Sequence, residues 1–124
     1  MNEVETIENA LIKYVSISMA DHGVLTFYIG LKFASSFCCF GGYIIGHGYL
    51  GAEQFDATDK GLTAMMKIMD VVGVDKWEDL QGKYCRVKSK GLGDSIKTIG
   101  NIMSDKWFNI EEHFKEDIRY EEST

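Results

Sequence analysis

The sequence predicts an α+β domain: an antiparallel sheet of about five strands packed against one main helix, with a short C-terminal helix. Two stretches, 7–19 and 24–33, alternate apolar with polar residues, which is typical of strands that bury one face. A third stretch, 60–72, places its apolar residues at helical spacing instead. A chain of 124 residues, 45% of them hydrophobic, can fill one core but not two. We therefore expect residues 1–124 to form a single domain.

The first two strands are expected to form a hairpin. The intervening residues 20–23, Ala-Asp-His-Gly, suit a tight turn, and Gly23 can adopt the positive φ that such turns need. In the second strand the odd-numbered residues of 25–33 are apolar and would face the core, whereas the even-numbered ones would be at least partly exposed. In the first strand one face would carry Leu11, Val15, Ile17 and Met19.

The third strand is interrupted by a pair of glycines. It reads Cys38-Cys39-Phe40-Gly41-Gly42-Tyr43-Ile44-Ile45-Gly46, with bulky residues on both sides of the pair. Glycine inside a strand usually marks a bulge, or a place where another backbone or a ligand approaches closely. Both interpretations remain open from the sequence.

The main helix is expected to begin after Thr58 or Asp59, since either side chain can accept a hydrogen bond from a free amide of the first turn. Gly73 is expected to end the helix. Its methionines are expected to fill gaps in the core rather than to contact a cofactor. The apolar stripe of this helix comprises Leu62, Met65, Met66, Met69 and Val72.

The remaining elements are short. Residues 75–80 are expected to form a helical turn, and 84–88 and 95–103 two further strands separated by a turn at 91–94. Beyond them, Ile110, Phe114 and Ile118 are spaced four apart, which indicates the short C-terminal helix.

Composition limits the classes of function. The net charge of -6 argues against binding of duplex nucleic acid, which requires a surplus of lysine and arginine. Three cysteines, two of them adjacent, make no disulfide framework and indicate a reduced, cytoplasmic compartment. The N-terminus resembles no signal peptide, and no apolar run is long enough to cross a membrane.

Catalytic and metal chemistry find little support. His22, His47 and His113 are scattered, and none has a second ligand at zinc-binding spacing. We therefore expect no catalytic residues, no metal and no cofactor. A Cys–His nucleophile pair stays an alternative, although all three cysteines lie in strand-like apolar patterns, where buried cysteine is common.

A binding constellation is better supported. Arg86 and Lys88 would lie on one strand face, and Lys106 stands beside Trp107 and Phe108. Aromatic planes next to cations can hold a purine by stacking and its phosphates by charge. The alternative is that the aromatic residues belong to the core and that the cations lie on a solvated strand face.

The order and spacing of several motifs resemble the first type of phage Thoeris anti-defence proteins, over about residues 7–108. Each motif alone is weak, whereas their succession is fairly specific. The motifs are Asp21-His22-Gly23, Leu25-Thr26-Phe27, Phe40-Gly41-Gly42-Tyr43, Val72-Gly73-Val74, Lys76-Trp77-Glu78-Asp79-Leu80, Gly82-Lys83-Tyr84, Arg86-Val87-Lys88, Ile99-Gly100-Asn101 and Asp105-Lys106-Trp107-Phe108.

The resemblance implies a non-enzymatic sponge: a single ligand-binding domain that holds cyclic ADP-ribose isomers, the signals made by bacterial TIR-domain immune proteins, without cleaving them. It also implies a homo-oligomer in the cytoplasm of the infected host: similar proteins form dimers that can join into hexamers, and some bind cyclic oligonucleotides at a second site. A nucleotide-signal hydrolase and a small structural oligomer are the alternatives.

The resemblance and the residue patterns together give a set of candidate ligand-binding residues. They are aromatic rings, cations, flexible glycines and polar side chains that could meet a nucleotide. The set is Phe40, Gly41, Gly42, Trp77, Arg86, Lys88, Asn101, Asp105, Lys106 and Trp107.

Overall fold

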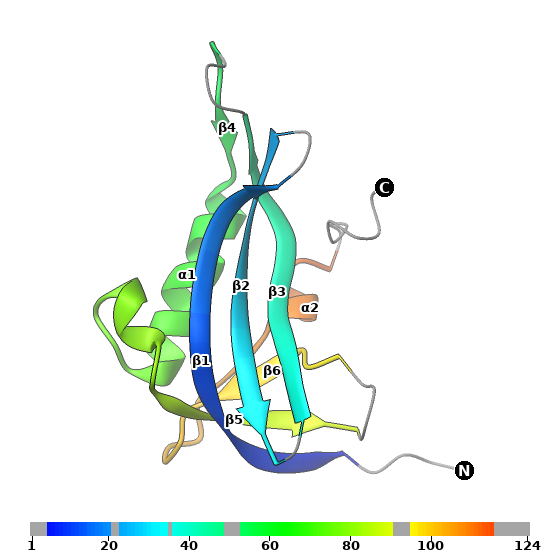
Figure 1. Ribbon diagram of the computed structural model, residues 1–124, viewed down its shortest axis with the longest axis vertical. Coiled ribbons are helices and arrows are strands. Elements are labelled where there is room, and N and C mark those ends of the chain that lie inside the picture. Colours follow the sequence, from blue (N-terminus) through cyan, green and yellow to red (C-terminus); the bar gives the residue numbers. More distant parts are fainter. Residues whose placement is uncertain (1–4, 21–22, 35, 49–52, 91–94, 116–124) are drawn as a thin grey trace.

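The computed structural model describes residues 5–20, 23–34, 36–48, 53–90 and 95–115 (Figure 1). Within them the chain forms one antiparallel sheet of seven strands, in the order β4-β3-β2-β1-β5-β6-β7, with one main helix and a short one. The elements are β1 (Thr6–Ala20), β2 (Val24–Phe33), β3 (Ser36–His47), β4 (Asp56–Ala57), α1 (Asp59–Val72), the 3-10 helix η2 (Trp77–Leu80), β5 (Tyr84–Ser89), β6 (Thr98–Gly100), β7 (Trp107–Asn109) and α2 (Ile110–His113).

The α+β class is as predicted, but the sheet has seven strands rather than about five. One extra strand is β4, two residues that pair with the end of β3 and carry no periodicity of their own. The other is β7, which lies beyond the predicted strand 95–103; of that stretch only 98–100 form a strand, β6. The Asn101 side chain accepts hydrogen bonds from the backbone N–H groups of Met103 and Ser104, each at 2.9 Å. This local turn ends β6, and the chain returns as β7.

A bulge in β1 reverses the faces of that strand. Residues 6–11 pair with β5, residues 11–20 pair with β2, and the register shifts between Ile12 and Tyr14. Because Lys13 is an extra residue in the strand, the alternation of side chains between the two faces is reversed in the residues that follow it. Leu11 therefore lies on the opposite face from Val15, and the prediction that they share a face was wrong.

The second face of the hairpin is more covered than the alternation indicated. Gly30 is buried beneath the ring of Tyr14, since a Cβ at Gly30 would lie 2.2 Å from the ring atom Cε1. Thr26 is only 1% exposed. Gly23 has φ 74°, as the predicted turn requires, whereas Asp21 and His22 of that turn lie outside the described residues, as do 91–94 and Ile118.

Helix α1 begins and ends at predicted residues. The Thr58 hydroxyl accepts the backbone N–H of Gly61 at 3.0 Å, and Gly73 adopts φ 95° at the other end. The predicted stripe was partly wrong: Leu62 and Met66 are 64% and 66% exposed. The fully buried positions of this helix are Gly61, Ala64, Ile68 and Val71.

Small residues explain why the face of α1 that packs on the sheet differs from the predicted apolar stripe. A Cβ at Gly61 would lie 2.4 Å from the Cβ of Ile45 on β3, so the helix backbone packs directly on the sheet. Figure 1 shows α1 beside and partly behind β1, and shows β5 and β6 running across the direction of β1, β2 and β3 at one end of the sheet. The core between them includes Phe27, Phe40, Ile68, Ile99 and Phe114. No helix among the described residues is long and apolar enough to cross a membrane.

Candidate ligand-binding site

The three strands β5, β6 and β7 expose one face and bury the other. Val87, Ile99 and Phe108 lie in register across them and are all at most 6% exposed. The neighbouring rows point the opposite way, because successive residues of a strand alternate between faces. These two rows are Arg86–Gly100–Trp107 and Lys88–Thr98–Asn109.

Trp107 lies across Gly100 and meets both cations of β5. A Cβ at Gly100 would be 2.3 Å from the indole atom Cε3, so only glycine leaves room for the ring to lie across β6. The guanidinium carbon of Arg86 and the ammonium nitrogen of Lys88 each lie 4.6 Å from the indole centroid. Cations at this distance from a ring are attracted by its π system. The indole Nε1 donates to the Asp105 carboxylate at 2.7 Å, which fixes the ring in its plane.

Arg86 organises the turn that carries these groups. Its Nε donates to the backbone oxygen of Asn101 and its Nη2 to that of Ser104, both at 2.7 Å. The sequence analysis expects this cation to hold a phosphate by charge, but two of its five donors are directed at the turn 101–106. The remaining donors and the charge stay next to Trp107.

The same turn is attached to the C-terminal end of α1. The Asn101 amide nitrogen donates to the backbone oxygen of Val71 at 2.8 Å, and the Lys106 ammonium lies 3.2 Å from the Asp70 carboxylate. Carbonyls at a helix C-terminus lack partners within the helix, so the Asn101 side chain completes one of them. The structure therefore brings Arg86, Lys88, Asn101, Asp105, Lys106 and Trp107 together around one turn.

A small cavity adjoins Lys88 on the side away from this turn. It has a volume of about 170 Å³, and we call it the lysine cavity. Lys97 within it is paired with Glu111, at the start of α2. Ammonium groups dominate its lining over carboxylates by three to two, and polar side chains complete it: Lys88, Lys90, Lys97, Glu5, Glu111, Ser95, Thr98 and Asn109.

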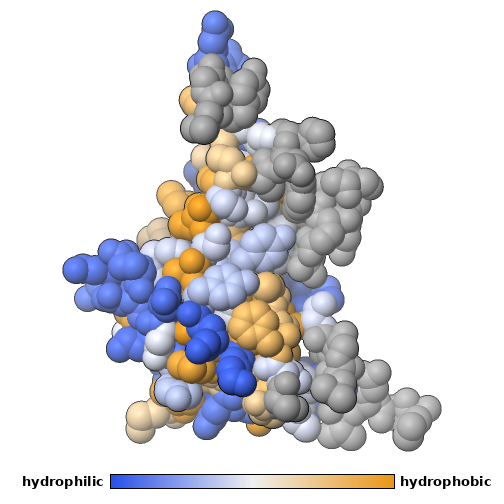
Figure 2. All heavy atoms as spheres, viewed as in Figure 1, coloured by the Kyte–Doolittle hydropathy of each residue, from blue (hydrophilic) through white to orange (hydrophobic). Residues whose placement is uncertain are grey.

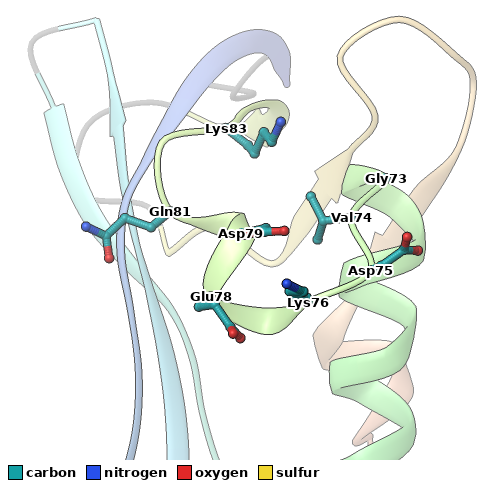
Figure 3. Close-up of a pocket in the computed structure, with 8 residues that line it drawn as sticks. All are labelled: Gly73, Val74, Asp75, Lys76, Glu78, Asp79, Gln81 and Lys83. Atoms are coloured by element: carbon teal, nitrogen blue, oxygen red, sulfur yellow. The ribbon is translucent and has the colours of Figure 1, made fainter.

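Two larger depressions lie nearby on the surface. One of about 530 Å³ is bordered by Trp107 and includes Lys67, Asp70 and His113. The other, of about 590 Å³, lies between the end of α1 and η2 (Figure 3). Three carboxylates and two ammonium groups surround it, and Figure 3 shows them spread around the space without converging on one point. No predicted site residue lines this second depression. Among the described residues no group of three or more His, Cys, Asp and Glu could hold a metal ion.

The glycine pair and Phe40 lie apart from the Trp107 turn, on β3. Phe40 is fully buried in the core. Gly41 and Gly42 have φ 116° and 91°, and the pairing of β2 with β3 shifts register beside them. A Cβ at Gly41 would lie 2.5 Å from the backbone oxygen of Phe27, and one at Gly42 would lie 3.0 Å from the Tyr28 ring. The close approach expected here is thus made by β2, at a bulge.

Trp77 belongs to the same part of the core. Its ring meets that of Phe27 edge to face, with the centroids 5.6 Å apart. Its indole Nε1 is buried and has no hydrogen-bond partner among the described residues. Four of the ten candidate residues, the three on β3 and Trp77, therefore lie against β2 rather than with Trp107.

Sequence reasoning missed the part played by Gly100 and the lysine cavity. Gly100 was noticed only within a motif, and Lys90, Lys97 and Thr98 were not singled out. A signal was present, because Lys88 and Lys90 are two residues apart and extend one strand face past the end of β5. The partner strand could not be aligned with it, since β6 is only three residues long.

The open face of β1, β2 and β3 carries exposed aromatic side chains, and we call it the aromatic face. Tyr14 stacks on Phe37 with centroids 6.0 Å apart, and its hydroxyl lies 3.1 Å from the Cys39 sulfur. This hydrogen bond, with a smaller effect of burial, raises the pKa of Tyr14. Phe37 is 54% exposed. Figure 2 shows aromatic rings gathered in the middle of this face.

Comparison of the chain with models of known protein families, with curated proteins and with solved structures gave no match.

Proposed function

We propose that this chain binds a cyclic ADP-ribose isomer, holds it without cleavage, and thereby inhibits TIR-based Thoeris defence in the cytoplasm of an infected bacterium. The observation that carries the proposal is the Trp107 ring with two cations, Arg86 and Lys88, each 4.6 Å from its centroid. A cyclic ADP-ribose isomer offers a purine that can stack and a pyrophosphate that needs positive charge. The resemblance in sequence supplies the identity of this ligand.

The geometry suits capture. The indole is held by Asp105 and supported by Gly100, so its orientation is set before a ligand arrives. Arg86, Asn101 and Lys106 fix the surrounding turn to α1 and β5. A preorganised site loses little conformational entropy on binding, which favours the high affinity that a sponge for a scarce signal needs.

We extend the proposal to assembly. A homo-oligomer, either a dimer or a hexamer, is favoured by the exposed rings of the aromatic face, because soluble monomers rarely leave large apolar patches bare. Cyclic oligonucleotides at a second site remain part of the proposal through the resemblance alone.

Recovery of the ligand tests the proposal. The chain is incubated with cyclic ADP-ribose, freed of unbound nucleotide, denatured by heat, and the released material is identified by chromatography. Intact nucleotide released from the wild-type chain supports sequestration. A hydrolysed product points to the alternative enzyme, and absence of uptake points to a structural oligomer.

Trp107→Ala and Lys76→Ala serve as the matched pair for that experiment. Trp107→Ala should bind the nucleotide about five- to 150-fold more weakly, since stacking of a base on an aromatic ring is worth about 1–3 kcal/mol. Lys76 is exposed and lines the depression of Figure 3, so Lys76→Ala should bind as the wild type does. Equal loss in both variants would contradict the placement of the ligand at Trp107.

A further inference from the structure

The lysine cavity is lined by three lysines from two segments of the chain. Lys88 lies on β5, Lys90 is the first residue after β5, and Lys97 is the last residue before β6. We propose that this cavity is a binding site for a phosphate or pyrophosphate group. In the proposed function the cavity would receive the pyrophosphate of the nucleotide whose base stacks on Trp107, and this assignment of the ligand rests on that function. The proposal that the cavity binds an anion is independent of the proposed function.

The cavity offers hydrogen-bond donors besides the ammonium groups. The Thr98 hydroxyl oxygen accepts the Asn109 amide at 2.9 Å, which leaves the hydroxyl hydrogen able to donate to an anion. The orientation of Asn109 is fixed in turn, because its carbonyl oxygen accepts the backbone N–H of Glu112 at 2.7 Å. Asn109 therefore presents its N–H group to Thr98, and the Thr98 oxygen is already occupied as an acceptor.

The size of the cavity fits a small anion. A volume of about 170 Å³ is below the roughly 300–1,000 Å³ typical of pockets that enclose a whole drug-sized ligand. It corresponds to the share of liquid volume of about six water molecules. A phosphate or pyrophosphate group can enter it, whereas the rest of a nucleotide must lie outside.

Lys88 connects the cavity to the aromatic plane. Its ammonium nitrogen is 4.6 Å from the Trp107 centroid, and Lys88 is also one of the residues that line the cavity. The two features lie on adjacent rows of one sheet face, the rows of Arg86–Gly100–Trp107 and Lys88–Thr98–Asn109. One ligand with a base and a phosphate can therefore reach both at once.

Two carboxylates offset part of the positive charge of the cavity. Glu111 is paired with Lys97, with side chains 56% and 41% exposed, and Glu5 contributes a second negative charge. An incoming anion competes with Glu111 for Lys97. Exposed ion pairs contribute little to stability, so this exchange costs little. Removal of the Glu111 charge should strengthen binding of an anion, whereas it would weaken binding of a cation.

Calorimetric titration with inorganic pyrophosphate tests the site on the intact chain. Lys97→Ala should lower the affinity for pyrophosphate by about tenfold, as expected when a charge-assisted hydrogen bond is lost. Glu111→Gln should raise the affinity, and Lys76→Ala should leave it unchanged. Thermal melts of each variant establish that it is folded, and Lys97→Gln replaces Lys97→Ala should the latter fail to fold. Equal pyrophosphate affinities in all variants, or weaker binding by Glu111→Gln, would overturn the anion site.

A parallel titration with cyclic ADP-ribose separates this inference from the proposed function. Pyrophosphate binding that Lys97→Ala weakens, without any binding of cyclic ADP-ribose, would uphold the anion site and remove the proposed function. Cyclic ADP-ribose bound equally by the wild type and by Lys97→Ala would uphold the function and overturn the assignment of the subsite. Loss of affinity for both probes in Lys97→Ala supports both.

Discussion

Arg86 illustrates how one residue can be located by sequence while its task is not. Its place on one strand face with Lys88 follows from alternation alone, as predicted. Its donors are directed to the backbone oxygens of Asn101 and Ser104, fifteen and eighteen residues later. Such contacts depend on a turn whose geometry is set by the Asn101 side chain, which no periodicity reveals. The guanidinium thus holds a turn as well as supplying charge.

Arg86→Lys separates these two tasks. Lysine keeps the positive charge but lacks the planar fork that reaches two carbonyl oxygens at once. We expect Arg86→Lys to lose nearly as much affinity for cyclic ADP-ribose as Arg86→Ala, about tenfold, and to speed amide hydrogen exchange in 101–106. Hydrogen-exchange mass spectrometry and calorimetry measure the two effects. Retention of wild-type affinity and exchange by Arg86→Lys would show that only the charge matters.

At the scale of elements, features set by neighbouring residues were predicted correctly, whereas features that depend on contacts between distant segments were not. The cap at Thr58, the stop at Gly73 and the β1–β2 pairing follow from chemistry within a few residues, and the structure has all three. The bulge at Lys13 is different, because it depends on how β1 divides its pairing between β5 and β2. The rotation of α1 also depends on a distant contact, the one between Gly61 and Ile45.

Gly61→Ala tests how closely α1 packs on the sheet. Glycine to alanine within an exposed helix normally stabilises it, by about 1 kcal/mol. Here the added Cβ would lie 2.4 Å from Ile45, so overpacking should lower the free energy of unfolding by roughly 1–3 kcal/mol. Chemical denaturation measures this change. Leu62→Ala, at a position 64% exposed, should change stability by about 0.5 kcal/mol or less.

The reverse ranking of these two variants would restore the stripe that the sequence predicts. A large loss for Leu62→Ala together with a gain for Gly61→Ala would mean that the Leu62 side of α1 faces the core.

At the scale of the whole molecule, the sheet is covered on one face by α1, η2 and α2, whereas the aromatic face carries exposed rings. The α+β class could be predicted because two strong periodicities, 2 and 3.6, occupy separate stretches of the chain. The candidate site was predicted only in part. Asn101, Asp105, Lys106 and Trp107, which are close in sequence, lie around one turn with Arg86 and Lys88, whereas Phe40, Gly41, Gly42 and Trp77 lie against β2.

The aromatic face gives a prediction about assembly. We expect a homo-oligomer at micromolar concentration, and Phe37→Asp should shift it toward the monomer, because a buried charge opposes an apolar contact. Multi-angle light scattering over a range of concentrations measures the mass. Met66→Asp is the control, at a site 66% exposed on α1. A monomer mass for the wild type across that range would remove the claim, and dissociation by Met66→Asp alone would place the interface on α1.

The two tryptophans differ in their surroundings, so the intrinsic fluorescence of the chain can report ligand binding. Both indoles are half-buried, but the Nε1 of Trp77 is buried without a partner among the described residues and its ring packs edge to face on Phe27, whereas Trp107 is hydrogen-bonded to Asp105 and flanked by two cations. Indoles in such different surroundings emit at different wavelengths, and the one with the buried Nε1 should emit toward the blue. A purine that stacks on Trp107 would quench the redder emission and leave the bluer one unchanged. Occupancy of the site can therefore be followed by intrinsic fluorescence, without any label that could disturb a small domain.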